Sequence, residues 1–348
     1  MTRVTFATYD DTPPLGGQGV MLQGMRAALE QRGVETATVS GRGTHAIRYA
    51  RVTGRAPLDL SLHLNRHPEE LLRADPDVVH AYGGPGGVIL LRRLDVPVVY
   101  TAHHTYRQAH GLTSPYRLPG PLEARAYHMA ALVLAVSQST ADAVRAMGVP
   151  ASRIGVLPPG VELPDIDGTS REPGRLLFVG RLERDKGVLD AVEVMRALVR
   201  SRPGTHGVII GAGSMAGKVQ ARIAGDPAIE YAGMAAPAVV RREYARAALL
   251  LMPSRYEGLG LVALEAQAAG TPVVGYDVDG LRHAAPDGGV LVPVGDVGRL
   301  LAAAEALLDD PARRDRLGAS GRDFVSRQHS WERMAARLQE VYTAVSRS

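Results

Sequence analysis

Two carboxylates flank a glycine-rich turn in the second half of the chain. Glu257 comes just before the turn that contains Gly258 and Gly260, and Glu265 lies one turn into residues 261–269, a run of good helix formers. Such a turn leaves backbone N–H groups unpaired at the positive end of a helix dipole, which favours a phosphate. A phosphate cradle between carboxylates suits a sugar nucleotide, because sugar hydroxyls need acceptors and a diphosphate needs donors.

Two cations precede a second expected helix. Arg181 and Lys186 follow the apolar strand at 175–180 and lie just before a helix expected from Val188 to about Val199. Cationic side chains and free N–H groups at a helix start can converge on a diphosphate. The alternative is a solvated basic turn.

The stretch around the two glutamates resembles a known family signature. Glu257 and Glu265, together with Pro253-Ser254 before them and Gly270-Thr-Pro-Val-Val after them, closely resemble the E-x7-E motif of retaining glycosyltransferases of the GT-B type (glycosyltransferase family 4-like, glycosyl transferases group 1). An isolated E-x7-E is more often a glycine-capped helix with two solvated glutamates. The segment from Gly180 to Gly187 also matches the family pattern G-R-x4-K-G without a gap.

The resemblance implies a role for each motif residue. Arg181 and Lys186 would stabilise the leaving nucleoside diphosphate, and Glu257 would hold sugar hydroxyls or support the developing cation. Glu265 would bind the nucleotide ribose, and His104 would contact the sugar. The other positions that the resemblance places near the donor are Gly16, Gly17, Gly180, Gly211, Gly213, Met234, Gly258, Leu259, Gly260, Leu261 and Val262.

Short apolar strands alternate with helical patterns along the chain, which predicts the α/β class with parallel sheets. Residues 3–8 form the first expected strand, followed by the loop Gly16-Gly-Gln-Gly19, a helix over 20–31 and a strand over 34–39. This order is the opening of a Rossmann-like unit. The loop lacks the spacing G-x-G-x-x-G and a ribose-reading acid, so NAD is not indicated. From spacing alone, it is equally a turn that needs small residues.

A second Rossmann-like unit starts after a linker. Residues 161–174 are rich in Asp, Pro, Gly and Glu, the composition of an exposed connection. We therefore expect two domains, at 1–165 and 171–330, and the resemblance implies that the first binds the acceptor and the second the nucleotide sugar. A C-terminal helix over 331–348, containing the only tryptophan, is expected to return to the first domain as in the resembling family.

The histidines differ in their expected roles. His103 and His104 end a strand, where side chains reach the ligand crevice of an open α/β sheet, and the family pattern favours His104. The alternative is a strand-end histidine bonded to a loop. His63 and His67 have helical i, i+4 spacing but no third ligand, so a solvated helix face is favoured over a metal. His80 is expected to be structural.

Asp277 and Asp279 spell D-x-D, the metal-binding signature of the other major glycosyltransferase architecture. Here the resembling family normally has two adjacent glycines, and we interpret Asp279 as replacing the first of them. No metal site is expected. An extra carboxylate near the donor would favour a sugar that offers a hydrogen-bond donor.

Bulk properties limit the class of protein. The chain has 348 residues, long enough for two domains, with 45% hydrophobic and 22% charged residues and no cysteine. A net charge of +4 is too mild for a nucleic-acid partner. No apolar run approaches membrane-spanning length, and the N-terminus is strand-like, not a signal peptide. A cytoplasmic protein with at most peripheral membrane contact is expected.

The resemblance implies an enzyme that transfers a hexose or N-acetylhexosamine from a nucleoside diphosphate sugar to a hydroxyl acceptor, and these observations are compatible with it. Retention at the anomeric carbon and no obligatory metal or cofactor are expected, with a UDP-sugar favoured over GDP-mannose. The alternatives are a UDP-sugar epimerase or hydrolase on the same fold, and a non-catalytic nucleotide-sugar-binding protein.

Overall fold

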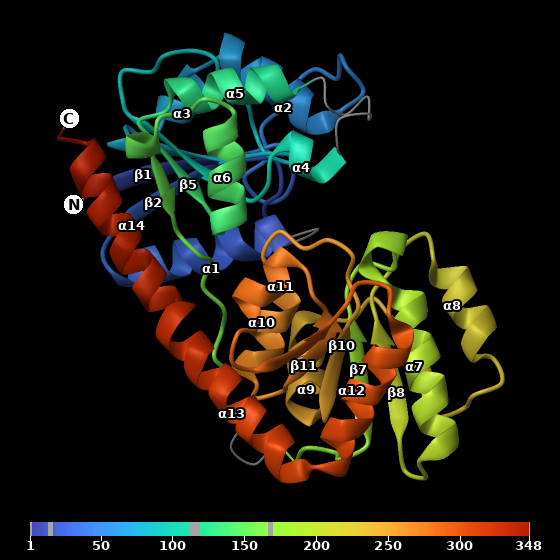
Figure 1. The fold of residues 1–348 in the computed structure, drawn as a ribbon. Helices are drawn as coiled ribbons and strands as arrows, with labels where there is room; N and C mark the ends of the chain where they lie inside the picture. The colour runs from blue at the N-terminus through green and yellow to red at the C-terminus, as the bar shows by residue number, and fades with distance from the viewer. Residues whose placement is uncertain (1, 13–16, 111–118, 166–169, 348) are drawn as a thin grey trace. The chain divides into compact units, whose positions relative to one another are not determined.

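A computed structural model describes residues 2–12, 17–110, 119–165 and 170–347. The chain divides into two compact units, one made of Met1–Gly160 with Trp331–Ser348 and the other of Val161–Ser330. Each unit holds one six-stranded parallel sheet with helices packed on it (Figure 1). None of the helices in the described residues is long and apolar enough to cross a membrane.

The first unit has the strand order β2-β1-β3-β4-β5-β6. Its four central strands are almost wholly buried, as expected for a parallel sheet covered on both faces, and its two edge strands are partly exposed. The strands are β1 (Arg3–Thr8), β2 (Glu35–Ser40), β3 (Val78–Gly83), β4 (Val98–Ala102), β5 (Leu132–Ala135) and β6 (Ile154–Val156). The helices are α1 (Gly17–Gln31), α2 (Ala56–Arg66), α3 (Glu69–Leu72), α4 (Tyr106–His110), α5 (Gly120–Met129), α6 (Gln138–Ala146), η2 (Ala151–Arg153) and α14 (Trp331–Val345).

The last helix, α14, packs against α1 within the first unit. Trp331 lies so close to Gly24 that a Cβ there would overlap its ring, and the same is true at Gly160. Further along α14, the Tyr342 hydroxyl lies 2.6 Å from Nδ1 of the fully buried His80. Because His80 Nε2 also lies 2.7 Å from Thr101 Oγ1, both ring nitrogens are paired and His80 is structural, as predicted.

Helix α1 begins earlier than expected. Gly17 is its first residue, so the prediction that Gly17 lies in a loop is wrong. The Gln18 side chain donates to the carbonyl of Pro85 at 3.2 Å, which fixes the first turn of the helix. Glycine is tolerated at a helix start, so Gly17 can be its first residue. Gly16 lies outside the described residues.

The second unit has the strand order β12-β11-β10-β7-β8-β9. Its strands are β7 (Arg175–Val179), β8 (His206–Ile210), β9 (Ile229–Gly233), β10 (Leu249–Met252), β11 (Val273–Tyr276) and β12 (Gly289–Val292). Its helices are η3 (Arg184–Lys186), α7 (Val188–Ser201), α8 (Ala216–Ile223), α9 (Pro237–Arg246), α10 (Leu261–Ala268), α11 (Asp279–Ala284), α12 (Val297–Asp309) and α13 (Pro311–Gln328). The chain reverses its direction of strand addition between β7 and β10, and ligands of open α/β sheets bind at the carboxyl ends of strands at such a point.

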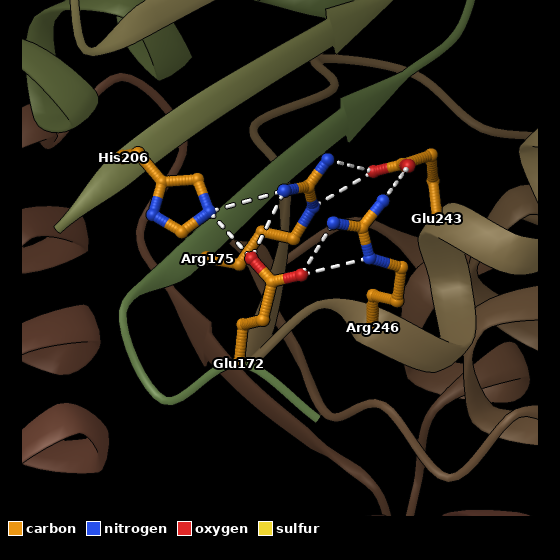
Figure 2. Close-up of polar contacts among 5 residues, drawn as sticks. All are labelled: Glu172, Arg175, His206, Glu243 and Arg246. Carbon is orange, nitrogen blue, oxygen red and sulfur yellow. Dashed lines mark hydrogen bonds and ion pairs between the residues drawn. The ribbon is translucent and has the colours of Figure 1, made fainter. Parts of the chain in front are cut away.

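An ionic network closes the opposite end of this sheet, where β7 begins (Figure 2). The buried Arg175 donates to Glu243 from Nε at 2.8 Å and to Glu172 from Nη1 at 3.1 Å. Arg246 also donates to both carboxylates, and His206 Nε2 lies 2.9 Å from Glu172. Because a buried guanidinium is tolerated only when it is paired, this network anchors the segment that leads into β7.

Candidate active site

Two loops meet at the reversal point of the second sheet. One follows β7 and contains the G-R-x4-K-G segment, and the other follows β10 and contains the first glutamate of E-x7-E. The sequence separates these motifs by about 70 positions, and the order β10-β7 makes them neighbours.

Glycines allow the loops after β7 and β8 to touch. Gly211 packs on Gly180 so closely that a Cβ at Gly211 would overlap the Gly180 carbonyl, and a Cβ at Gly213 would lie 2.5 Å from the Leu182 carbonyl. The two loops share backbone hydrogen bonds, Gly180 N–H to Ile210 O at 3.0 Å among them. The structure thus brings together the predicted positions Gly180, Gly211 and Gly213.

Lys186 and Glu257 form a direct ion pair. The Lys186 ammonium donates to Glu257 Oε1 at 2.7 Å and to the carbonyl of Tyr256 at 3.4 Å. Both side chains are mostly buried, with 18% and 11% of their surface exposed. A positive and a negative group therefore face the same point at the carboxyl end of the sheet.

Three residues that sequence reasoning missed hold this pair in place. The Asp190 carboxylate, in the first turn of α7, accepts from Tyr276 at 2.7 Å and pairs with Arg255 at 2.9 Å. The backbone N–H of Arg255 also donates to the carbonyl of Asp185 at 2.8 Å. Burial raises the pKa of the Tyr276 phenol, so it stays a donor. These contacts tie the loop before Glu257 to the start of α7.

Two glycines permit the close approach of backbone segments around Glu257. Gly187 has φ +66°, and a Cβ there would overlap the carbonyl of Pro253. A Cβ at Gly280, in the first turn of α11, would overlap the carbonyl of Glu257. Gly280 is the second position of the expected glycine pair, and its neighbour Asp279 is the departure noted in the sequence.

The α10 helix begins where the glycine-rich turn predicts. Gly260 is its N-cap in a left-handed conformation (φ +75°), and its carbonyl accepts from Ala263 and Leu264. The N–H groups of a helix's first turn have no partner within the helix, so those of Leu261 and Val262 are available to a ligand. Leu259 is buried and Gly258 is half-buried beside them.

Glu265 lies further along the same helix. Its Oε2 accepts a hydrogen bond from the buried Tyr244 hydroxyl at 2.8 Å. Burial raises the pKa of Glu265, although the hydrogen bond from Tyr244 acts in the opposite direction. Tyr244, on α9, is a further residue of the site that no sequence motif predicted.

Two predicted residues of this unit are mostly exposed to solvent. Arg181 is 68% exposed and lies 3.6 Å from Asp185. Met234 is 76% exposed and follows β9, the edge strand, two strands away from β7.

Asp277 and Asp279 share one cationic partner. Arg282 donates to Asp277 at 2.5 Å from Nε and to Asp279 at 2.7 Å from Nη1. The hydrogen bond from Arg282 lowers the pKa of Asp277. Within the described part of the chain, no group of three or more His, Cys, Asp or Glu side chains could hold a metal ion.

His104 belongs to the first unit, where it follows β4 and is half-buried. His103 is buried and stacks on Tyr82, with ring centroids 5.3 Å apart. Burial lowers the pKa of His103 to about 3, so its ring is neutral. His104 is therefore the more accessible of the two adjacent histidines.

Comparison with known proteins identifies the family. Residues 15–164 match the family described as Glycosyltransferase Family 4, and residues 173–310 match that described as Glycosyl transferases group 1. A glycogen synthase of Mycobacterium tuberculosis is 33% identical over 290 residues, covering 78% of this chain and 70% of that protein. The chain belongs to the glycosyltransferases that combine these two family regions, Glycosyltransferase Family 4 and Glycosyl transferases group 1. A D-inositol 3-phosphate glycosyltransferase of Xylanimonas cellulosilytica is also 33% identical, covering 78% of this chain and 72% of that protein.

Solved structures show the same fold for this glycosyltransferase. Sucrose-phosphate synthase from Thermosynechococcus elongatus has a TM-score of 0.79 at 20% identity and covers 99% of both chains. HepE of Anabaena, solved in complex with UDP-glucose, has a TM-score of 0.72 at 16% identity and covers 99% of this chain and 100% of its own. The fold is therefore GT-B, with two Rossmann-like parallel-sheet domains, as predicted.

Proposed function

We propose that this glycosyltransferase moves a hexose or N-acetylhexosamine from a UDP-sugar to a hydroxyl acceptor. Retention at the anomeric carbon and independence from an obligatory metal are part of the proposal. The observation that carries it is the Lys186–Glu257 pair at 2.7 Å, beside the start of α7 and at the reversal point of the second sheet. The choice of UDP is supported by the UDP-glucose complex of the structurally similar HepE.

The charges of this site match those that develop during the reaction. Breaking the anomeric bond leaves negative charge on the departing diphosphate and positive charge on the sugar. Lys186, the more exposed Arg181 and the N–H groups at the start of α10 answer the first charge by preorganised electrostatics. Glu257, held by Lys186, answers the second through the sugar hydroxyls or the cation itself.

The route with retention that we propose is a same-face displacement. The double displacement of glycosidases needs a carboxylate nucleophile on the face of the sugar opposite the leaving group. In the proposed route the leaving phosphate accepts the proton of the acceptor hydroxyl while the new bond forms on the same face. Glu265 would bind the nucleotide ribose, and His104 would contact the sugar.

A thermal-shift panel with EDTA present tests the donor. UDP and UDP-sugars should raise the melting temperature of the wild type by several degrees, because a ligand at about 100 times its Kd adds about 2.7 kcal/mol. Glu265→Ala should lose this shift. Glu230→Ala is the matched control, since Glu230 is an exposed glutamate of the same unit. GDP- and ADP-sugars should give little shift.

Three outcomes of this panel would count against the proposal. A shift that appears only with Mg²⁺ or Mn²⁺ would indicate that the donor binds through a metal ion, with Asp277 and Asp279 as candidate ligands. A shift with GDP-sugars alone would replace the donor. If no nucleotide shifts the melting temperature, the transferase proposal itself fails.

A further inference from the structure

Glu123, on α5, is a buried carboxylate of the first unit with no role in the reaction above. Only 1% of the surface of Glu123 is exposed to solvent. Its Oε2 accepts from the backbone N–H of Tyr106 at 3.0 Å, and its Oε1 accepts from the Tyr127 hydroxyl at 3.0 Å. The backbone N–H of Gly84 is a third donor.

These three partners, all from the described residues, are hydrogen-bond donors. A carboxylate can accept from all three, whereas an amide or a protonated acid would set a donor of its own against one of them. Among the described residues, no cation contributes to the pKa of Glu123, which burial raises to about 7. A buried carboxyl without a cation is costly to the fold, and this cost points to a role other than stability.

The three donors come from segments on both sides of His104. Gly84 follows β3, and Tyr106 begins α4 just two residues after His104. Gly84 has φ +80°, and its Cα lies so close to the His104 carbonyl that a Cβ would overlap it. On the other side, Thr140 donates to the carbonyl of His103 at 3.2 Å. The backbone of His104 is thus held through Gly84 and Tyr106, and Glu123 joins both.

We infer that Glu123 is a positioning residue for His104: its carboxylate fixes the backbone at the carboxyl ends of β3 and β4, so that the imidazole meets the donor sugar in one orientation. This inference rests on the proposed function. Glu123 itself is enclosed and contacts neither sugar nor nucleotide. It acts through the backbone of its neighbours.

The titration of Glu123 gives a signature that a purely structural group would not show. In the part of the chain that the structure describes, the titratable side chains that face it are the phenols of Tyr100 on β4, Tyr106 on α4 and Tyr127 on α5, which do not titrate near neutrality. Because the pKa of Glu123 is raised in the fold, its contribution to stability is greatest when it is protonated and is lost as the pH rises through about 7. By contrast, Glu123 fixes the backbone of His104 best when it is ionised, so this effect is lost as the pH falls. From pH 8 to 6, turnover should therefore fall while the melting temperature does not.

The test compares Glu123→Gln with Glu69→Gln, an exposed glutamate of the same unit. Turnover of UDP-glucose at pH 8, as transfer or hydrolysis, should fall about 10- to 100-fold in Glu123→Gln, because misplacing a substrate contact by about 1 Å has effects of this size. UDP affinity should stay within about twofold, as its proposed ligands lie in the other unit. The acid limb near pH 7 should disappear. Glu69→Gln should match the wild type.

Two further arms keep the result decisive. In a His104→Ala background, Glu123→Gln should have almost no additional effect on turnover, and an undiminished effect would overturn the inference. If Glu123→Gln does not fold, Tyr127→Phe removes one donor to the carboxylate and should move the acid limb to higher pH. An unmoved limb in that variant would also overturn it.

A spectroscopic readout separates this inference from the proposed function. In protein labelled with carbon-13 at histidine Cε1, the signal that disappears in His104→Ala should shift or broaden in Glu123→Gln, while that of His206 stays. If the wild type turns over no sugar nucleotide, the proposed function fails and this signal still decides the positioning. An unchanged His104 signal, or unchanged turnover in Glu123→Gln, overturns the inference.

Discussion

Turnover of the donor sugar should fall about 10²- to 10³-fold when Lys186 is replaced by alanine, the usual effect of removing one preorganised donor to a developing negative charge. The ammonium is held by Glu257 at 2.7 Å and by the Tyr256 carbonyl, so it is in place before the diphosphate departs. Water would replace it poorly, since this side chain is only 18% exposed.

The sequence offers a matched control for this variant. Lys218 is the only other lysine in the chain and lies exposed on α8 of the same unit. Lys218→Ala should retain wild-type turnover, and both variants should keep the circular dichroism spectrum of the wild type. Steady-state release of UDP from UDP-glucose measures the effect. Normal turnover in Lys186→Ala would remove this residue from the mechanism.

Gly187→Ala should cost about 2–4 kcal/mol of folding stability and reduce turnover strongly. A left-handed φ of +66° is strained for alanine by about 1–3 kcal/mol, and the new methyl group would overlap the Pro253 carbonyl. To relieve the overlap, the loop after β10 must move away from the start of α7. That motion would separate Glu257 from Lys186, so activity and stability should fall together.

Gly204→Ala isolates the effect of the close contact. Gly204 lies in the same unit with φ +84°, but a Cβ there would meet nothing within 4 Å. This variant should pay only the cost of the backbone conformation, about 1–2 kcal/mol, and keep normal turnover. Urea denaturation and steady-state kinetics of both variants give the comparison. Equal losses would mean that the approach of Gly187 to Pro253 does not organise the site.

The parts of the site that the sequence predicts are those encoded within one short segment. The turn at Gly258 and Gly260 opens α10 as expected, because glycine supplies the left-handed N-cap at Gly260. Lys186 similarly lies just before α7, at the end of the short helix η3. The α/β class and the parallel sheets follow from apolar runs of strand length, which are read locally as well.

The parts that the sequence does not predict depend on contacts between distant segments. Asp190 and Arg255 are ordinary helix-start and loop residues until the strand order places β7 beside β10. Glu123 has the sequence context of a surface helix, and only the packing of α5 buries it. Gly17 shows the limit at element ends, where a helix start shifts by a few residues without changing the pattern of apolar positions.

The most direct test of the account is a calorimetric titration of UDP, in EDTA, into the wild type, Lys186→Ala and Lys218→Ala. We expect one binding site per chain in the wild type and in Lys218→Ala, with equal affinity. Lys186→Ala should bind at least about tenfold more weakly, since a charge-assisted hydrogen bond contributes about 1.5–3 kcal/mol. Equal affinity in all three proteins, or binding that requires a divalent metal, would contradict the assignment of the diphosphate to the site around Lys186.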